Sequence, residues 1–183
     1  MSEGELLQIE KARNLNITEE IYFEIIRQKT ASLISACCAI GVSSVTNDNE
    51  YLKKIKKLGE YIGIAFQIKD DLFDIIGSQE ETGKDMAADV KKNMITLPLI
   101  YAKQNLSEKQ LKKLKNLLKV KNKSKTDIKL LKDIVKEVGG FAHAQEKILY
   151  YSEKAKNSLK SFKSSEYKKS LIDLVDFNIN RLG

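Results

Sequence analysis

The sequence predicts an all-α protein, and three observations support this fold class. Apolar residues recur every three or four positions along most of the chain, which is the period of one helical face. A single proline occurs among the 183 residues, so little in the chain interrupts a helix. No segment has the pattern of a strand, a repeat or a linker between domains. We therefore expect one helical domain that comprises residues 1–183.

Two helices are expected near the start of the chain. The segment SEGELLQIEKARNLNI carries Leu6, Leu7 and Ile9 at helical spacing. The pattern breaks before Thr18, which precedes two glutamates as a helix-capping residue does. From there, EEIYFEIIRQKTASLISACCAIGVSSV is expected to form a long helix that frays at Gly41 and the two serines after it.

The next helix is expected to start at Asn47 or Asp48 and to continue to Ile76. Its second half is apolar nearly all round, which predicts a central position in the fold. The polar segment GSQEETGKDMAADVKKNMI follows, and we expect it to form a loop of the length that is often functional. A helix restarts at TLPLIYAKQ, where Pro98 lies in the first turn.

The rest of the chain predicts amphipathic helices. The lysine-rich segment Leu106–Asp133 places lysine and leucine at helical spacing. KTDIKLLKDIVKEVGG is expected to form a helix that ends at Gly139 and Gly140, and FAHAQEKILYYSEKAKNSLKSF and EYKKSLIDLVDFNINRL two more. His143, between two alanines, is expected to be a packed or half-exposed helical residue rather than a base.

The net charge of +7 favours a polyanionic partner, such as nucleic acid, an anionic membrane surface or a phosphate-rich substrate. Most lysines are interpreted as a solvated coat on helical polar faces. The lysine-rich segment contains no aromatic residue, so it lacks the platforms on which single-stranded nucleic acids stack. A basic helical nucleic-acid binder is therefore a weak rival, and we expect no nucleic-acid partner.

Cysteine usage and hydropathy predict a cytoplasmic protein. Cys37 and Cys38 are adjacent, so we expect reduced thiols that act as small packing residues. No basic and then apolar leader is found. No apolar run approaches the roughly 20 residues that span a bilayer, so at most a peripheral membrane contact is expected.

Three aspartates interrupt the apolar segment GIAFQIKDDLFDI, and with Gln67 they form one helical stripe. Gln67, Asp70, Asp71 and Asp74 are spaced i, i+3, i+4 and i+7. Carboxylates at this spacing repel one another and are costly to bury unpaired. Oxygen ligands without histidine or cysteine indicate a hard cation, and Mg²⁺ is typically shared between carboxylates and substrate phosphates. The stripe thus predicts a magnesium site. The alternative is a solvent-facing acidic stripe, whereas an EF-hand is excluded by its spacing.

The segments FQIKDDLFDI, TGK, Asp89 and TLPLIYA together resemble the second aspartate-rich region of the all-trans polyprenyl diphosphate synthases. SEGELLQIEKAR, YFEIIRQKTASLI and the glycine pair at 139 and 140 resemble other parts of the same family. The resemblance covers essentially the whole chain and is strongest to the long-chain, octaprenyl-type enzymes. It implies an antiparallel helical bundle of the isoprenoid synthase type around a deep cavity, usually a homodimer.

The resemblance also implies an activity, the condensation of isopentenyl diphosphate with an allylic diphosphate. In the family, Mg²⁺ held between two aspartate-rich motifs binds the allylic diphosphate, which ionises to a carbocation that the second substrate attacks. By this resemblance Asp70 is a direct metal ligand, and Asp71 and Asp74 act directly or through metal-bound water. Terpene cyclases share the metal chemistry, but the TGK and TLPLI segments favour chain elongation.

Four further residues gain roles from the resemblance. Lys29 and Lys84 would contact the allylic diphosphate, and Thr30 and Gln67 would present oxygens near the carbocation. Lys29 lies mid-helix among apolar residues, where the alternative is an aliphatic stem that reaches out to water. Lys84 follows a glycine in the polar loop, where the alternative is an ordinary solvated lysine.

The chain departs from the family pattern in two ways. Many members have a lysine two residues before the threonine of TLP, where this chain has Met94; Lys91 or Lys92 is the candidate substitute. The first aspartate-rich motif and the arginines after it are absent, because Asp173 and Asp176 form only DxxD. The resemblance therefore predicts an incomplete bundle, the C-terminal portion of a synthase, inactive alone. The alternative is a non-catalytic helical partner subunit of a synthase.

Overall fold

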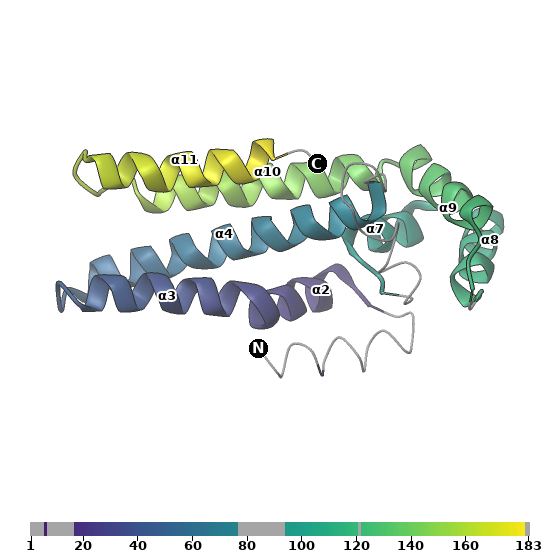
Figure 1. Cartoon of the computed structure of the whole chain (residues 1–183). Helices are drawn as coiled ribbons and strands as arrows, with labels where there is room; N and C mark the ends of the chain where they lie inside the picture. The colour runs from purple at the N-terminus through teal and green to yellow at the C-terminus, as the bar shows by residue number, and fades with distance from the viewer. Residues whose placement is uncertain (1–5, 7–16, 77–93, 121, 182–183) are drawn as a thin grey trace. The chain divides into compact units, whose positions relative to one another are not determined.

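The computed structural model describes residues 6, 17–76, 94–120 and 122–181. Every regular element among these residues is a helix, which confirms the all-α prediction (Figure 1). The elements are α2 (Glu19–Ile26), η1 (Arg27–Ala31), α3 (Ser32–Ser43), α4 (Asn49–Ile76), α7 (Leu97–Asn105), α8 (Glu108–Lys119), α9 (Lys125–Glu137), α10 (Gly140–Ser158) and α11 (Glu166–Asn180). Of the segment between α4 and α7, only residues 94–96 are described.

Contacts between the described residues divide them into two compact units. The first unit comprises Leu6, Phe23–Lys69 and residues 147–181, and the second comprises residues 17–22, 70–76, 94–120 and 122–146. The single-domain assignment from the sequence stays a prediction.

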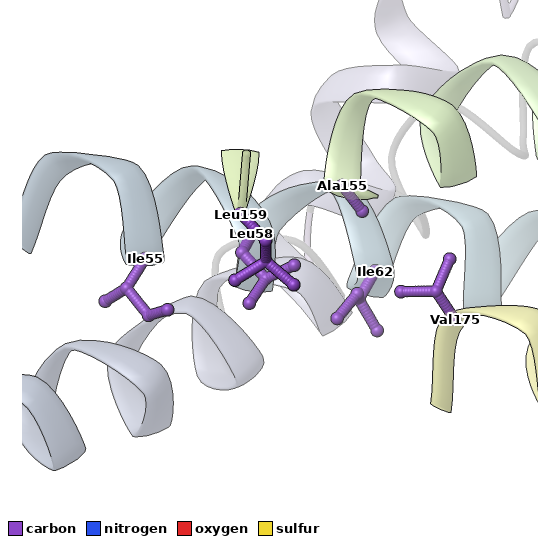
Figure 2. Close-up of a cluster of buried hydrophobic side chains, with 6 residues drawn as sticks. All are labelled: Ile55, Leu58, Ile62, Ala155, Leu159 and Val175. Carbon is purple, nitrogen blue, oxygen red and sulfur yellow. The ribbon is translucent and has the colours of Figure 1, made fainter. Parts of the chain in front are cut away.

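The first unit is an antiparallel arrangement of α3, most of α4, the second half of α10, and α11 (Figure 1). Figure 2 shows the centre of its core: Ile55, Leu58 and Ile62 from α4, Ala155 from α10, Leu159 just after it, and Val175 from α11. Burying each large side chain contributes about 1.5–3 kcal/mol. In the second half of α4, Ile64, Ala65 and Ile68 are also buried, as the apolar sequence of that half predicted.

Two glycines of α4 let the preceding helix approach closely. A Cβ atom at Gly59 would lie 2.7 Å from the Cα of Ser35. One at Gly63 would lie 2.5 Å from the Cα of Ala31. Only a residue without a side chain fits at such distances, so these glycines set the spacing between α4 and the η1–α3 segment.

The long helix expected after Thr18 is confirmed, with one difference. Residues Glu19–Ser43 are helical throughout, but the five residues of η1, Arg27–Ala31, form a π-helical turn. Such wide turns often occur at functional sites. Thr18 begins the helix as expected, since its Oγ1 accepts a 3.3 Å hydrogen bond from the backbone N–H of Ile21.

The start of α4 is fixed by Asp48 rather than by Asn47. The Oδ1 atom of Asp48 accepts hydrogen bonds from the backbone N–H groups of Glu50 (2.7 Å) and Tyr51 (3.3 Å). The helix is continuous as far as Ile76, the last residue of the predicted helix and the last one described before residue 94.

In the second unit, α9 contacts α7 and α8. Helices α8 and α9 each begin with a reciprocal capping box, formed by Ser107 with Gln110 and by Ser124 with Asp127. The lysines of α8 are exposed around its buried leucines, which confirms the solvated coat there. Gly139 ends α9 with a φ of 81°, but the expectation for its neighbour was wrong, because Gly140 begins α10.

Helix α3 differs from the sequence expectation at Cys37. Cys38 packs against the core of the first unit, but Cys37 is exposed and is not a packing residue.

By length and composition alone, the Glu19–Ser43 helix is the one described segment that could cross a membrane, and 17% of its apolar window is buried. Core helices of soluble proteins pass the same test, so this is weak evidence.

Candidate functional site

The aspartates lie on the last two turns of α4. Because this helix is continuous to Ile76, Gln67 and the three carboxylates share one stripe, as predicted. Asp71 is 8% exposed, and Asp70 and Asp74 are half-buried. The alternative of a solvent-facing stripe therefore fails at Asp71, whose carboxylate needs polar partners inside the protein.

One such partner is Tyr22, which sequence reasoning missed. Its Oη atom donates a 2.7 Å hydrogen bond to Oδ2 of Asp71, and both side chains are buried. Tyr22 precedes Asp71 by 49 residues. A lone tyrosine on an apolar helical face gives no sequence signal of such a contact.

A second charged group near the stripe is Lys132 of α9, which the sequence placed in the general lysine coat. Its Nζ atom lies 3.5 Å from the carbonyl oxygen of Ile76 at the end of α4. Burial lowers the pKa of Lys132, and the negative charge of Asp74 acts against this shift. The third aspartate of the stripe thus has a cation in its surroundings.

The structure brings together two of the residues that the resemblance assigned to substrate. Thr30 Oγ1 donates a 2.6 Å hydrogen bond to Oε1 of Gln67, so η1 and α4 are joined at this point. One turn away, Arg27 Nε donates to Oε1 of Glu60 at 3.2 Å. Lys29 lies in the same π-helical turn and is half-buried.

Two cations hold the end of α11 against α4 in the first unit. Lys69 is 3% exposed and donates a 3.0 Å hydrogen bond to the carbonyl of Ile179. Arg181 donates to the carbonyl of Phe66 at 3.4 Å, with its guanidinium 4.3 Å from the centre of that ring. Burial lowers the pKa of Lys69, and the charge of Arg181 adds to the shift. The sequence did not predict either contact.

The remaining candidates divide into described and undescribed residues. Lys84, Asp89, Lys91 and Lys92 lie outside the described residues, whereas Met94 is described and half-buried. His143 is a partly buried helical residue, as expected. Its Nε2 atom lies 2.9 Å from Oε2 of Glu19, and its ring stacks on Tyr101 with centroids 4.3 Å apart.

The donor set of the stripe fits a shared metal site better than a closed one. Among the residues that the structure describes, no three His, Cys, Asp or Glu side chains converge to hold an ion by themselves. Mg²⁺ does not need such a cage, because it keeps several waters and combines one or two carboxylates with substrate phosphates. Asp70, Asp71 and Asp74 provide carboxylates of this kind.

Comparison with known proteins gives one consistent result. The family model described as Polyprenyl synthetase matches residues 1–138. The chain is 30% identical over 182 residues to a short chain isoprenyl diphosphate synthase of Methanothermobacter thermautotrophicus, covering 98% of this chain and 54% of that protein. It is 34% identical over 135 residues to heptaprenyl diphosphate synthase component 2 of Bacillus subtilis, and the match covers 74% of this chain and 37% of that protein.

Solved structures show the same similarity in three dimensions. A polyprenyl synthase of Caulobacter crescentus, crystallised with calcium and isoprenyl diphosphate, superposes with a TM-score of 0.91 at 28% identity. The similarity covers 98% of this chain and 55% of that one. A geranylgeranyl pyrophosphate synthetase of Pyrococcus horikoshii gives the same TM-score at 29% identity. This similarity covers 99% of this chain and 55% of that one. The chain thus spans about half the length of these relatives.

Proposed function

The chain belongs to the polyprenyl synthetase family, and from this premise we propose that it contributes one wall of the active site of a prenyltransferase. The reaction would join isopentenyl diphosphate to an allylic diphosphate in isoprenoid biosynthesis. The stripe of Asp70, Asp71 and Asp74 would bind Mg²⁺ together with the allylic diphosphate. The observation that best supports this proposal is the burial of Asp71 on the stripe. A buried carboxylate is retained where a cation or a hydrogen-bond donor contacts it.

Each residue of the proposed site has a limited task. Bound Mg²⁺ would neutralise the negative charge that develops on the leaving diphosphate. Lys29, and Lys84 outside the described residues, would contribute positive charge to the same group. The hydrogen bond between Thr30 and Gln67 joins the two side chains, and their oxygens would lie near the cationic carbon.

The proposed site has one aspartate-rich wall within this sequence. The chain matches 54% of the M. thermautotrophicus synthase, and its sequence contains one DDxxD motif. A diphosphate bound through Mg²⁺ on one side only is poorly oriented and poorly neutralised. We therefore expect the purified chain to bind pyrophosphate with a divalent cation and to lack condensation activity by itself.

A titration tests this proposal. Binding of Mn²⁺, as a probe of the Mg²⁺ site, is measured calorimetrically in the presence of inorganic pyrophosphate. We expect Asp70→Ala to weaken binding about tenfold or more, as the loss of a direct ligand should. Asp173→Ala on α11 is the matched control, because this carboxylate is exposed and outside the stripe. Equal affinities in the wild type and Asp70→Ala would show that the proposed cation site does not exist.

A second assay tests the need for a complement. The purified chain is incubated with an allylic diphosphate, labelled isopentenyl diphosphate and Mg²⁺, and incorporation of label is measured. We expect none. Measurable incorporation would show that the chain condenses substrates without another polypeptide.

A second candidate function, that of a subunit that pairs with another synthase polypeptide, is favoured by α3. No charged residue occurs from Thr30 to Asn47, although 31% of the whole chain is charged. Leu33 and Ile40 are 49% and 70% exposed on this helix. An uncharged, exposed helical face of this kind marks an interaction surface, and one relative is named as component 2 of its enzyme.

The partner of this face would be a helical polypeptide of another synthase chain. A homodimer is the other expected assembly. Co-purification with a tagged full-length polyprenyl synthase tests the first assembly, and the mass of the isolated chain tests the second. Ile40→Glu should abolish whichever of the two assemblies the wild-type chain forms. Tyr167→Glu, on the exposed side of α11, should not affect it.

A further inference from the structure

Asp71 is more deeply buried than the other two aspartates of the stripe, and Tyr22 is one of its partners. It is the most deeply buried acidic residue among those that the structure describes, at 8% exposed. The hydroxyl of Tyr22, itself 4% exposed, donates a 2.7 Å hydrogen bond to its Oδ2 atom. A bond of this length to a carboxylate is charge-assisted, and such bonds are stronger than those between neutral groups.

Tyr22 is held in place by the start of α2. The carbonyl of Thr18 accepts the backbone N–H of Tyr22 at 3.0 Å, and the side chain of Thr18 caps the same turn. Glu19, three residues before Tyr22 and on the same helical face, contacts His143 of α10 at 2.9 Å. The phenol is therefore a fixed donor on an anchored helix turn.

We propose that Tyr22 is a positioning residue of the metal site, which orients the carboxylate of Asp71 for a divalent cation. The inference rests on the proposed function, because it assigns a role toward the cation that the stripe would bind. The hydrogen bond engages one oxygen of the carboxylate and prevents rotation of the group. The other oxygen, Oδ1, then has a fixed direction for the cation or its bound water.

A purely structural role would give a different result from a positioning role. If the phenol only satisfies a buried carboxylate, its loss lowers the stability of the fold and leaves cation affinity unchanged. If it orients the carboxylate, its loss weakens cation binding, because partners of ligating carboxylates typically change metal affinity by ~10–100-fold. The two roles are therefore separated by measuring affinity and thermal stability on the same variants.

The variant Tyr22→Phe removes the hydroxyl and keeps the ring. Mn²⁺ binding with inorganic pyrophosphate should weaken by about tenfold, in the range seen when such a partner is lost. The melting temperature without metal is measured in parallel to confirm that the variant is folded. Tyr101→Phe is the matched control: it removes a hydroxyl from a half-buried ring of the same unit, and we expect wild-type affinity.

A double-mutant cycle with Asp71→Asn identifies the route of the effect. If Tyr22 acts through Asp71, adding Tyr22→Phe to Asp71→Asn should not weaken binding further. An equal loss in both backgrounds would overturn the inference, as would wild-type affinity in Tyr22→Phe when Asp70→Ala binds weakly. No binding by the wild-type chain would defeat the proposed function and this inference together.

Discussion

Gly63 of α4 packs directly against Ala31 at the end of the π-helical turn. A Cβ atom at Gly63 would lie 2.5 Å from the Cα and 2.8 Å from the Cβ of Ala31. Thr30 is the neighbour of Ala31, and Gln67 lies one turn beyond Gly63 on α4. The contact of two minimal residues thus brings the backbones close enough for the 2.6 Å hydrogen bond between Thr30 and Gln67.

The variant Gly63→Ala should therefore destabilise the first unit. The new methyl group meets backbone atoms of Ala31, so the helices must separate rather than a side chain rotate. Overpacking of this kind costs about 1–3 kcal/mol, and the midpoint of urea unfolding measures it. Gly41→Ala is the control, because nothing lies within 4 Å of its added Cβ. That variant should gain about 0.5–1 kcal/mol from helix propensity. Equal midpoints for the two variants would contradict the close contact.

Lys132 should weaken the binding of a divalent cation when pyrophosphate is absent. The Asp74 carboxylate lies near enough to oppose the burial-induced lowering of the Lys132 pKa, so the ammonium group also repels a cation on the stripe. Lys132→Gln should raise Mn²⁺ affinity by about threefold to tenfold, because a nearby unit charge contributes ~1 kcal/mol in surroundings of high dielectric constant. High salt should reduce the difference by screening. Lys136→Gln, an exposed residue one turn further along α9, should have no effect.

The capping box of α9 should make stability depend on pH in the acid range. Hydrogen bonds from the side chain and backbone of Ser124 lower the pKa of Asp127 from its model-peptide value of 3.8. The unfolded chain therefore binds this proton at a higher pH than the folded chain does. The contribution is present above pH 3.8 and is lost as pH falls through the lower folded pKa.

The variant Ser124→Ala removes the side-chain part of this effect. Its urea midpoint should fall below that of the wild type at pH 7, and the difference between them should be smaller at about pH 3. Ser164→Ala, which is exposed and is not a helix cap, should follow the wild type at both pH values. A difference that is independent of pH would show that the Asp127 carboxylate is not part of the cap.

The sequence predicted features that depend on neighbours along the chain. Helical periodicity located α4, and Asp48 and Thr18 were recognised as capping candidates because a cap depends on residues two or three positions away. The aspartate stripe was found for the same reason, since its spacing of three and four residues lies within one helix. Family resemblance then supplied the roles of Thr30 and Gln67, which spacing could not.

Contacts across long sequence separations were not predictable. Tyr22 and Asp71 are 49 residues apart, and Lys69 and the Ile179 carbonyl are 110 apart. Neither Tyr22 nor Lys69 differs in type from residues that serve only packing or solvation. The π-helical turn at Arg27–Ala31 was also missed, because its residues are ordinary helix formers and the wider turn depends on tertiary contacts.

Cys37 offers a direct probe of the uncharged face of α3. It is exposed, and Leu33 and Ile40 lie four residues before and three after it, on the same helical face. Burial raises the pKa of the neighbouring Cys38 thiol, with a further rise from Cys37, so less reactive thiolate forms there. Maleimide at neutral pH should therefore label Cys37 first, with Cys37→Ser removing the fast phase and Cys38→Ser retaining it.

If this face binds another synthase polypeptide, the fast phase should slow at least tenfold in the purified complex, because a thiol at a buried interface is reached only when the complex opens. Unchanged labelling in a stable complex would place the partner elsewhere, since a contact that leaves Cys37 accessible does not cover the Leu33 and Ile40 face.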